Sequence, residues 1–291
     1  MTTLVVLALI GFAAQLVDGS LGMAYGVTST SLLLVMGLSP AMASASVHLA
    51  ELGTSLASGI AHSRFGNVDW KVVGGLALPG ALGAFLGAWA LSSFPAELAK
   101  PWVALFLLLL GGYVIFRFWR NTPNRKPTRD PSRSWLAPLG LVAGFLDAGG
   151  GGGWGPVATT TLLSRGRLEP RRVVGSVDTS EFLVALAASI GFLWFLGGSG
   201  IDLAWVLAIL VGGVMAAPLA AWLVQKLPSR ILATAAGGLI IITNLRTLMP
   251  YLEGFVSSWI YALVVPAILT VILLAWRREV QESALRSNPS D

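Results

Sequence analysis

Long apolar runs separated by short polar loops recur along the whole chain. Five lie in the first half, at residues 3–17, 23–37, 41–63, 70–93 and 101–119. Five lie in the second half, at 135–147, 154–164, 172–197, 203–225 and 231–249, and one more follows at 255–276. Runs of about 18 or more apolar residues can cross a hydrocarbon core as helices, and the period-two alternation of barrel strands is absent. The pattern predicts an all-α, polytopic integral membrane protein.

The composition agrees with a membrane protein and narrows its chemistry. Of 291 residues 55% are apolar and 11% are charged, whereas soluble domains carry about 25% charged residues. The absence of cysteine excludes disulfides and thiol chemistry, and two histidines, His48 and His62, are too few to favour an imidazole metal centre. No P-loop motif is present, which excludes ATP-driven pumping within this chain. We expect no cofactor, no metal and no enzymatic activity; His48 beside Glu51 is a weak catalytic candidate.

The net charge of +5 follows the positive-inside rule and does not indicate a nucleic-acid partner. If the central basic stretch is cytoplasmic, loops on that side hold Arg64, Lys71, Arg165, Arg167, Arg171, Arg172, Lys226, Arg230, Arg277 and Arg278. The opposite loops hold the basic residues Lys100 and Arg246, and Arg246 is expected to snorkel to the outer interface. We therefore expect a location in the cytoplasmic membrane, with the N-terminus outside and the C-terminus in the cytoplasm. The first run lacks the basic region and cleavage site of a signal peptide and is interpreted as a retained helix.

The second half of the chain repeats the first. Gly11–Asp18 resembles Gly140–Asp147, and Ser46–Glu51 parallels Ser176–Glu181. Because each copy has an odd number of segments, the second copy enters the membrane from the opposite side, and the repeats are inverted. The chain thus divides into a first membrane repeat (1–119), a basic cytoplasmic linker (120–134), a second, inverted repeat (135–250), an additional helix (251–276) and a cytoplasmic tail (277–291).

The first two segments of each copy are too short to cross the membrane, because a helix of about 14 residues spans only about 21 Å. Each pair is expected to form a hairpin of half-helices that turns inside the membrane, at Asp18–Gly22 and at Asp147–Gly153. Two such hairpins bring two helix N-termini to one central point, where free N–H groups favour an anion. The expected substrate-binding residues are turn glycines and nearby hydroxyls: Gly19, Ser20, Gly22, Thr28, Ser31, Gly149, Gly150, Gly151, Gly152, Gly153, Thr159 and Thr160.

A simpler interpretation of these residues is that the glycines allow close helix packing and the hydroxyls bond to their own backbone. For a single glycine the packing interpretation is better. For the run Gly149–Gly153, which follows Asp147 and recurs in degenerate form after Asp18, we favour a binding site.

Acidic residues inside the expected membrane segments are the second candidate feature. Glu51 and Glu181 are repeat equivalents near the middle of long segments, and His48 and Asp178 precede them by one helical turn. An ionisable group at this depth is costly and points to a function. Proton coupling is one interpretation, since carboxylates repel an anion unless they are protonated; structural bracing is the other, and both stay open. Asp18 and Asp147 are interpreted as structural, holding loose amides at the hairpin tips.

The glycine turns resemble those of the sulfite exporter TauE/SafE family, also called the toluene-sulfonate uptake permease family. Gly140–Pro156 is similar to the glycine-rich signature of that family, which is followed by a proline, and Asp18–Trp70 is also similar to family members. The first copy departs from the pattern, with Ser20–Ala24 where a glycine run is expected and Val27 at the position of Pro156. The resemblance extends over nearly the whole chain.

The resemblance implies transport of a small sulfur-containing anion, such as sulfite or an organosulfonate like sulfoacetate. We expect a secondary transporter, proton-coupled, that works by alternating access around a site near the membrane midplane. The alternative is a divalent cation transporter that uses membrane-embedded carboxylates as ligands. The expected partners are the lipid bilayer and a small anionic substrate, and a homodimer is left open.

Overall fold

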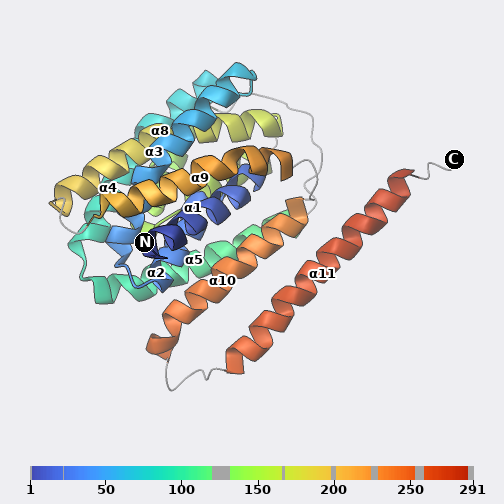
Figure 1. Ribbon diagram of the computed structural model, residues 1–291. Coiled ribbons are helices and arrows are strands. Elements are labelled where there is room, and N and C mark those ends of the chain that lie inside the picture. Colours follow the sequence, from blue (N-terminus) through green and yellow to red (C-terminus); the bar gives the residue numbers. More distant parts are fainter. Residues whose placement is uncertain are drawn as a thin grey trace.

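The computed structural model describes residues 2–21, 23–119, 132–165, 168–197, 201–223, 229–252 and 259–287. Within these ranges every regular element is a helix, so the all-α prediction is confirmed (Figure 1). Gly22 and most of the expected linker, residues 120–131, lie outside the described residues.

The helices follow the order of the apolar runs. The first half holds α1 (Thr2–Leu21), α2 (Tyr25–Val35), α3 (Pro40–Arg64), α4 (Trp70–Ser93) and α5 (Ala96–Trp119). The second half holds α6 (Arg133–Gly150), a π-helical turn η1 (Gly155–Thr159), α7 (Thr160–Arg165), α8 (Pro170–Phe195), α9 (Leu203–Leu223) and α10 (Ser229–Leu252). The last helix is α11 (Trp259–Ser287), which continues well past the expected span into the predicted tail.

Four stretches of helix in the described part of the chain are long and apolar enough to cross a membrane, judged by length and composition: Trp70–Ser93, Ala96–Trp119, Arg172–Phe195 and Trp259–Arg278. Shorter apolar helices are Thr2–Asp18, Tyr25–Val35 and Leu203–Ala216. These helices support the prediction of a polytopic membrane protein, whereas the orientation of the chain in the membrane stays a prediction.

The helices of the two halves pack across one another. The most extensive contacts join α4 to α6 and α1 to α9. By the sequence repeat α4 corresponds to α9 and α6 to α1, so these two pairs are counterparts. Glycines let the backbones approach in both pairs: a Cβ on Gly140 of α6 would stand 2.6 Å from the Leu76 carbonyl oxygen of α4, and one on Gly212 of α9 would collide with the Ala8 carbonyl of α1.

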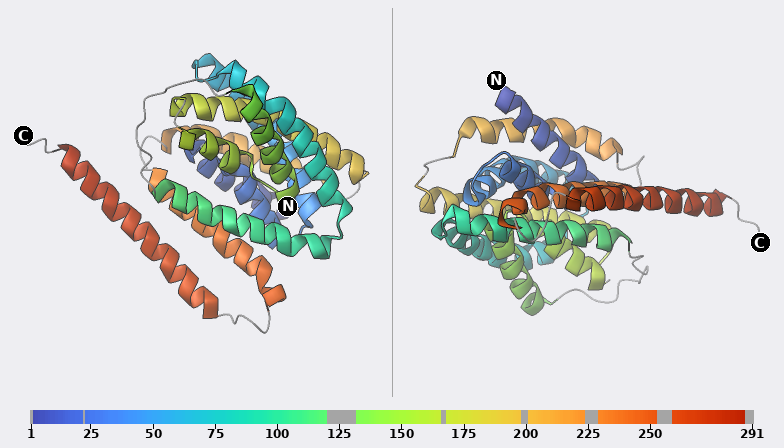
Figure 2. Two further views of the ribbon diagram at one scale, coloured as in Figure 1. Left: turned by 180° about the vertical axis from the view of Figure 1, so that it is seen from behind. Right: turned by 90° about the horizontal axis from the view of Figure 1, so that it is seen from below.

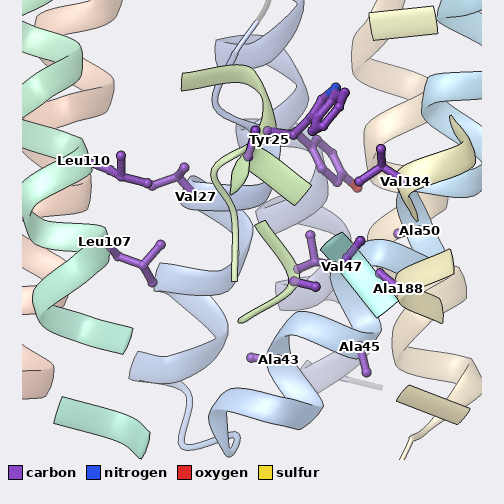
Figure 3. Packing of buried hydrophobic residues seen from close by; sticks show 14 of the residues in the cluster. Tyr25, Val27, Ala43, Ala45, Val47, Ala50, Leu107, Leu110, Val184 and Ala188 are labelled. Atoms are coloured by element: carbon purple, nitrogen blue, oxygen red, sulfur yellow. The ribbon is translucent and has the colours of Figure 1, made fainter. Parts of the chain in front are cut away.

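The centre of the bundle is formed by the crossing of α3 and α8, with α2 beside them. Figure 3 shows Val27 of α2 facing Leu110 of α5, and Ala50 of α3 beside Val184 of α8. Small side chains such as Ala50 and Ala188 are fully buried there, so that α3 and α8 can pack closely.

The helix α11 has no counterpart in the repeat and stands at the edge of the bundle (Figures 1 and 2). It packs mainly against α10, and few of its residues are buried. Arg278 also lies over the ring of Trp119 at the end of α5, 5.0 Å from its centroid. The residues of the candidate site described below come from other helices, and none from α11.

Two aspartates that are equivalent in the repeat begin equivalent helices. The Asp69 carboxylate accepts hydrogen bonds from the amides of Lys71 and Val72 at 3.0 and 3.4 Å, and the Asp202 carboxylate accepts one from Ala204 at 2.8 Å. An N-cap satisfies amides that have no partner inside the helix. These residues of the repeat therefore have a structural explanation.

The hairpin prediction is wrong in the bounds of its first helices, whereas the turning of each pair inside the membrane stays a prediction. The returning helices α2 and η1–α7 are short, at 11 residues for α2, but α1 has 20 residues and α6 has 18. At 1.5 Å per residue α1 spans about 30 Å, which is the thickness of a hydrocarbon core, and α6 spans about 27 Å. Asp18 and Asp147 thus lie inside helices and not in the turns. The helices extend because the end of α6 packs on α4, where Gly149 lies against Gly87.

Candidate functional site

Each hairpin tip is held by an aspartate one turn before the end of its first helix. Asp18 Oδ1 accepts hydrogen bonds from the amides of Ala24 and Tyr25 at 2.8 and 3.1 Å. In the second copy Asp147 Oδ1 accepts bonds from the amides of Gly153 and Trp154 at 2.7 and 2.9 Å. These are contacts of the structural kind expected from the sequence. They also occupy amides that we expected to bind an anion.

The two tips meet inside the bundle. A Cβ built on Gly26, at the start of α2, would stand 3.1 Å from the Cα atom of Gly152 and 3.2 Å from Glu51 Oε1. Gly151 and Gly152 have φ values of +76° and +140°, and a Cβ on Gly152 would collide with the backbone of Val27. Glycine is required at both positions by backbone conformation and by this close approach. The two tips and Glu51 therefore share one small region.

His48 on α3 joins its helix to the second hairpin. His48 Nδ1 lies 2.8 Å from the Ser44 carbonyl oxygen, and Nε2 lies 3.2 Å from Asp147 Oδ2. Ser44 Oγ in turn donates to the Ala148 carbonyl at 2.9 Å. His48 is 1% exposed and Asp147 is 3% exposed. A buried pair between imidazole and carboxylate thus fixes the tip of α6 to α3.

Glu51 lies one turn further along α3, beside both tips. Its ligand oxygen, one from Asp147 and a ring nitrogen of His48 all lie within 4.8 Å of one another. The side chain is 3% exposed, and Oε2 has no hydrogen-bond partner among the described residues. One imidazole and two carboxylates offer donors suited to a small cation or to protons.

Asp178 on α8 occupies the position equivalent to His48. Ser58 of α3 donates a hydrogen bond to Asp178 Oδ2, and His62 Nε2 lies 3.6 Å from the same oxygen. Asp178 is less deeply buried than His48, since its side chain is 15% exposed. The second copy therefore has a carboxylate where the first has an imidazole.

Together these residues form two half-sites, and each half-site combines residues from both repeats. Half-site A consists of His48 and Glu51 from the first copy and Asp147 from the second. Half-site B consists of the equivalent residues with the copies exchanged: Asp178 and Glu181 from the second copy and Asp18 from the first. Each half-site thus takes its hairpin aspartate from one repeat and its long-helix pair from the other.

A small cavity lies between the two tips. It is lined by Asp18, Asp147, Asp178 and Glu181, by residues at the starts of α2 and η1, and by Met23 and Val177. No lysine, arginine or histidine lines it among the described residues. The cavity leaves about 10 Å³ for the centre of a water molecule, which is room for about one. In this conformation the region between the tips is closed to an anion of the size of sulfite.

The predicted hydroxyl donors fall into two groups. Ser31 and Thr160 donate to backbone carbonyls one turn earlier, at Val27 and Pro156. Thr28 and Thr159 are buried and have hydroxyls without a partner in the described part of the chain. The simpler interpretation therefore holds for Ser31 and Thr160, whereas Thr28 and Thr159 keep free donors.

The predicted glycines also separate. Gly151, Gly152 and Gly153 form the turn, and Gly149 and Gly150 belong to the last turn of α6. Gly22 and the side chain of Ser20 lie outside the described part of the chain, and Gly19 belongs to the last turn of α1. The role of these glycines in binding stays a prediction.

Sequence reasoning missed several polar residues around the half-sites. Ser44, Ser55, Ser58 and His62 continue the stripe of His48 and Glu51 along α3 at steps of three and four residues. That spacing was a readable signal of one polar helix face. Asn244 of α10 was also missed: its Nδ2 donates to Ser31 Oγ at 2.6 Å and to the Ile240 carbonyl at 2.9 Å, which ties α10 to α2.

A larger cavity of about 530 Å³ lies between α4, α5 and α6. It is lined by apolar side chains such as Leu98, Trp102 and Phe106, together with Gly149 and Gly150. No charged side chain lines it among the described residues, so it offers no charged group to the candidate site.

The amino-acid sequence of the chain matches a known protein family. The family described as Sulfite exporter TauE/SafE matches residues 7–247. The chain is 53% identical over 279 residues to the "Probable membrane transporter protein YtnM" of Bacillus subtilis (strain 168), covering 95% of this chain and 91% of that protein. It is 28% identical over 189 residues to the "Probable membrane transporter protein YdhB" of the same organism, covering 62% of this chain and 74% of that protein. No solved structure matches the chain.

Proposed function

Because the chain belongs to the sulfite exporter TauE/SafE family of membrane transporters, we propose that it carries a small sulfur-containing anion by proton-coupled secondary transport. The substrate class is sulfite or an organosulfonate such as sulfoacetate. The transporter lies in the cytoplasmic membrane with its N-terminus outside, and access to the site alternates between the two sides.

The observation that carries this proposal is the meeting of two hairpin tips from opposite repeats beside buried carboxylates. The start of α2 lies against the turn Gly151–Gly152 that leads into η1. Each helix brings a threonine, Thr28 or Thr159, whose buried hydroxyl has no partner among the described residues. N-terminal helix turns and hydroxyl donors are groups that bind oxyanions. A site between two repeats is the usual place for substrate in secondary transporters.

The acidic lining explains why protons must accompany the anion. Two like charges about 4 Å apart repel by about 4 kcal/mol at an effective dielectric constant of 20, which weakens binding roughly a thousandfold. With Asp18, Asp147, Asp178 and Glu181 around the cavity, an anion enters only after carboxylates take up protons. The charges of the site thus support the proposed coupling of proton and anion.

A binding screen on purified protein tests this function. We expect sulfite, sulfoacetate or ethanesulfonate to raise the melting temperature saturably, with tighter binding at lower pH, and acetate to have no comparable effect. Binding that tightens as pH rises, or no binding by any of the three sulfur anions, would refute the proposal.

One observation favours divalent cation transport as a second candidate. The ligand atoms of His48, Glu51 and Asp147 lie within 4.8 Å of one another, and this compact set resembles the ligand set of a cation. Calorimetric titration with Mn²⁺ or Mg²⁺ separates the two functions. Saturable binding that disappears in Glu51→Gln supports the cation; sulfur-anion binding that is insensitive to a chelator supports the first proposal.

A further inference from the structure

The two half-sites differ chemically at one equivalent position. In half-site A His48 contacts the hairpin aspartate Asp147. In half-site B the equivalent residue is Asp178, which lines the same cavity as the hairpin aspartate Asp18. The glutamates Glu51 and Glu181 are equivalent. The two half-sites therefore hold different numbers of acidic groups, three in B and two in A, around otherwise matching helices.

Half-site A holds a proton of its own. A carbonyl oxygen can only accept, so His48 Nδ1 must donate to the Ser44 carbonyl. The contact between Nε2 and Asp147 Oδ2 then needs one further proton, carried by either atom. Both side chains are almost fully buried, at 1% and 4% exposure. The imidazole thus supplies a fixed proton beside the carboxylate of the second hairpin.

Half-site B has no such internal proton donor inside the cavity. Asp18, Asp178 and Glu181 line the cavity, and its lining includes no basic side chain among the described residues. His62 contacts Asp178 at 3.6 Å but lies outside the lining and is 27% exposed. Tyr25 lines the same cavity, is 4% exposed, and has a hydroxyl with no partner in the described structure. The cavity has room for about one water, and the three carboxylates of half-site B line it. It is therefore a place for an exchangeable proton.

Access also distinguishes the half-sites. The three residues of half-site A are at most 3% exposed, while Asp18, Asp178 and Glu181 are all partly exposed. A proton can therefore reach half-site B more directly in this conformation, whereas of half-site A only the nearly buried Asp147 lines the shared cavity.

We propose that half-site B is the single proton-exchange site of each chain. In half-site A the imidazole of His48 permanently keeps a proton beside Asp147, so that half-site A resembles half-site B after it has bound its proton. This inference rests on the proposed proton-coupled function, which it refines to one proton per transport cycle. Binding of one proton by the Asp178–Glu181 pair lowers the negative charge that faces the cavity, and its release to the other side restores it.

Several other groups face this pair and set the background for any pH dependence. They are Asp18 of α1, Tyr25 of α2, Glu51 and His62 of α3, and Asp147 of α6. The helix α4, which packs along α8, carries Lys71 in its exposed first turn as its ionisable side chain. Among the groups named on α1, α3 and α6, three carboxyl groups stand against one imidazole.

The repeat supplies the decisive variant, Asp178→His, which turns half-site B into a copy of half-site A. Wild-type protein and variants are reconstituted into liposomes with the membrane potential clamped at zero. Sulfoacetate is the probe, because its own charge does not change near neutral pH. At a pH difference of one unit, one coupled proton supports about tenfold accumulation and two support about a hundredfold.

We expect about tenfold accumulation for wild type and for the control Glu97→Gln, an acid in the first turn of α5 that does not line the cavity. We expect no accumulation for Asp178→His, with exchange of sulfoacetate in the absence of a gradient retained. A hundredfold ratio in wild type, or a tenfold ratio in Asp178→His, would overturn the inference.

A second measurement does not depend on transport. Infrared difference spectra between acidic and neutral pH should show a carboxylic acid band that Asp178→Asn and Glu181→Gln weaken and Glu51→Gln leaves unchanged. A band lost only in Glu51→Gln would place the exchanging proton in half-site A and refute the assignment. If wild type carries no sulfoacetate, the proposed substrate fails while this spectrum still decides where the proton binds; the Asn variant serves where Asp178→His does not fold.

Discussion

Replacing the aspartate at each hairpin tip by alanine should destabilise the protein unequally. Asp18→Ala removes two hydrogen bonds from a carboxylate to turn amides, at 2.8 and 3.1 Å. Asp147→Ala removes two amide bonds at 2.7 and 2.9 Å and also the contact with His48 at 3.2 Å. A hydrogen bond to a charged group contributes about 1.5–3 kcal/mol. Asp147→Ala should therefore cost about 1.5–3 kcal/mol more than Asp18→Ala.

The assay is thermal unfolding in detergent, followed by size-exclusion chromatography of the surviving fraction. A difference of that size lowers the midpoint by several degrees in a chain of this length, at roughly 2 °C per kcal/mol. Asp147→Asn is the matched control, since its Oδ1 still accepts from the turn amides and its Nδ2 can donate to His48 Nε2. We expect it to melt between wild type and Asp147→Ala. Equal midpoints for the two alanine variants, or an asparagine variant as unstable as alanine, would refute the reasoning.

The remaining predictions concern the approach of the two tips and the tie between α2 and α10. Gly152→Ala should abolish folding, because φ at this position is +140° and the added Cβ meets Val27. The measurement is loss of the monodisperse peak in size-exclusion chromatography. Gly149→Ala, whose added Cβ has its nearest atoms at 3.6 Å, should retain most of that peak. Equal loss for both would contradict this assignment. Asn244→Leu should lower stability by about 1–2 kcal/mol, and a double-mutant cycle with Ser31→Ala should show coupling between them. Additive effects in melting would show that the bond contributes nothing.

The fold was readable where apolar runs have clear boundaries. The segment expected at 70–93 is the helix α4 residue for residue, because Asp69 caps its start and Phe94–Pro95 ends it. The tips were misread because glycine disfavours helix in isolation, while in the folded chain Gly149 continues α6 against Gly87. Tertiary packing overrides the local preference at that point.

The sequence selected the candidate residues but not their arrangement. It offered Glu51, Glu181, His48 and Asp178 as proton-coupling or structural groups, and Asp18 and Asp147 as structural ones. It did not indicate that each hairpin aspartate faces the long helix of the other repeat, since His48 and Asp147 are 99 positions apart and nothing local joins them. The 129-residue offset relates Asp18 to its equivalent, Asp147. The contact in the structure instead joins Asp147 to His48, which is not its equivalent.

The shortness of α2 has a consequence for how the protein is made. A helix of 11 residues spans about 16 Å and carries four buried hydroxyl residues, Thr28, Ser29, Thr30 and Ser31. Such a segment is too short and too polar to partition into lipid on its own during synthesis. It must wait for α3, α5 and α10 to enclose it before its backbone and hydroxyls leave water. We therefore expect α2 to leave water later than the long helices that surround it.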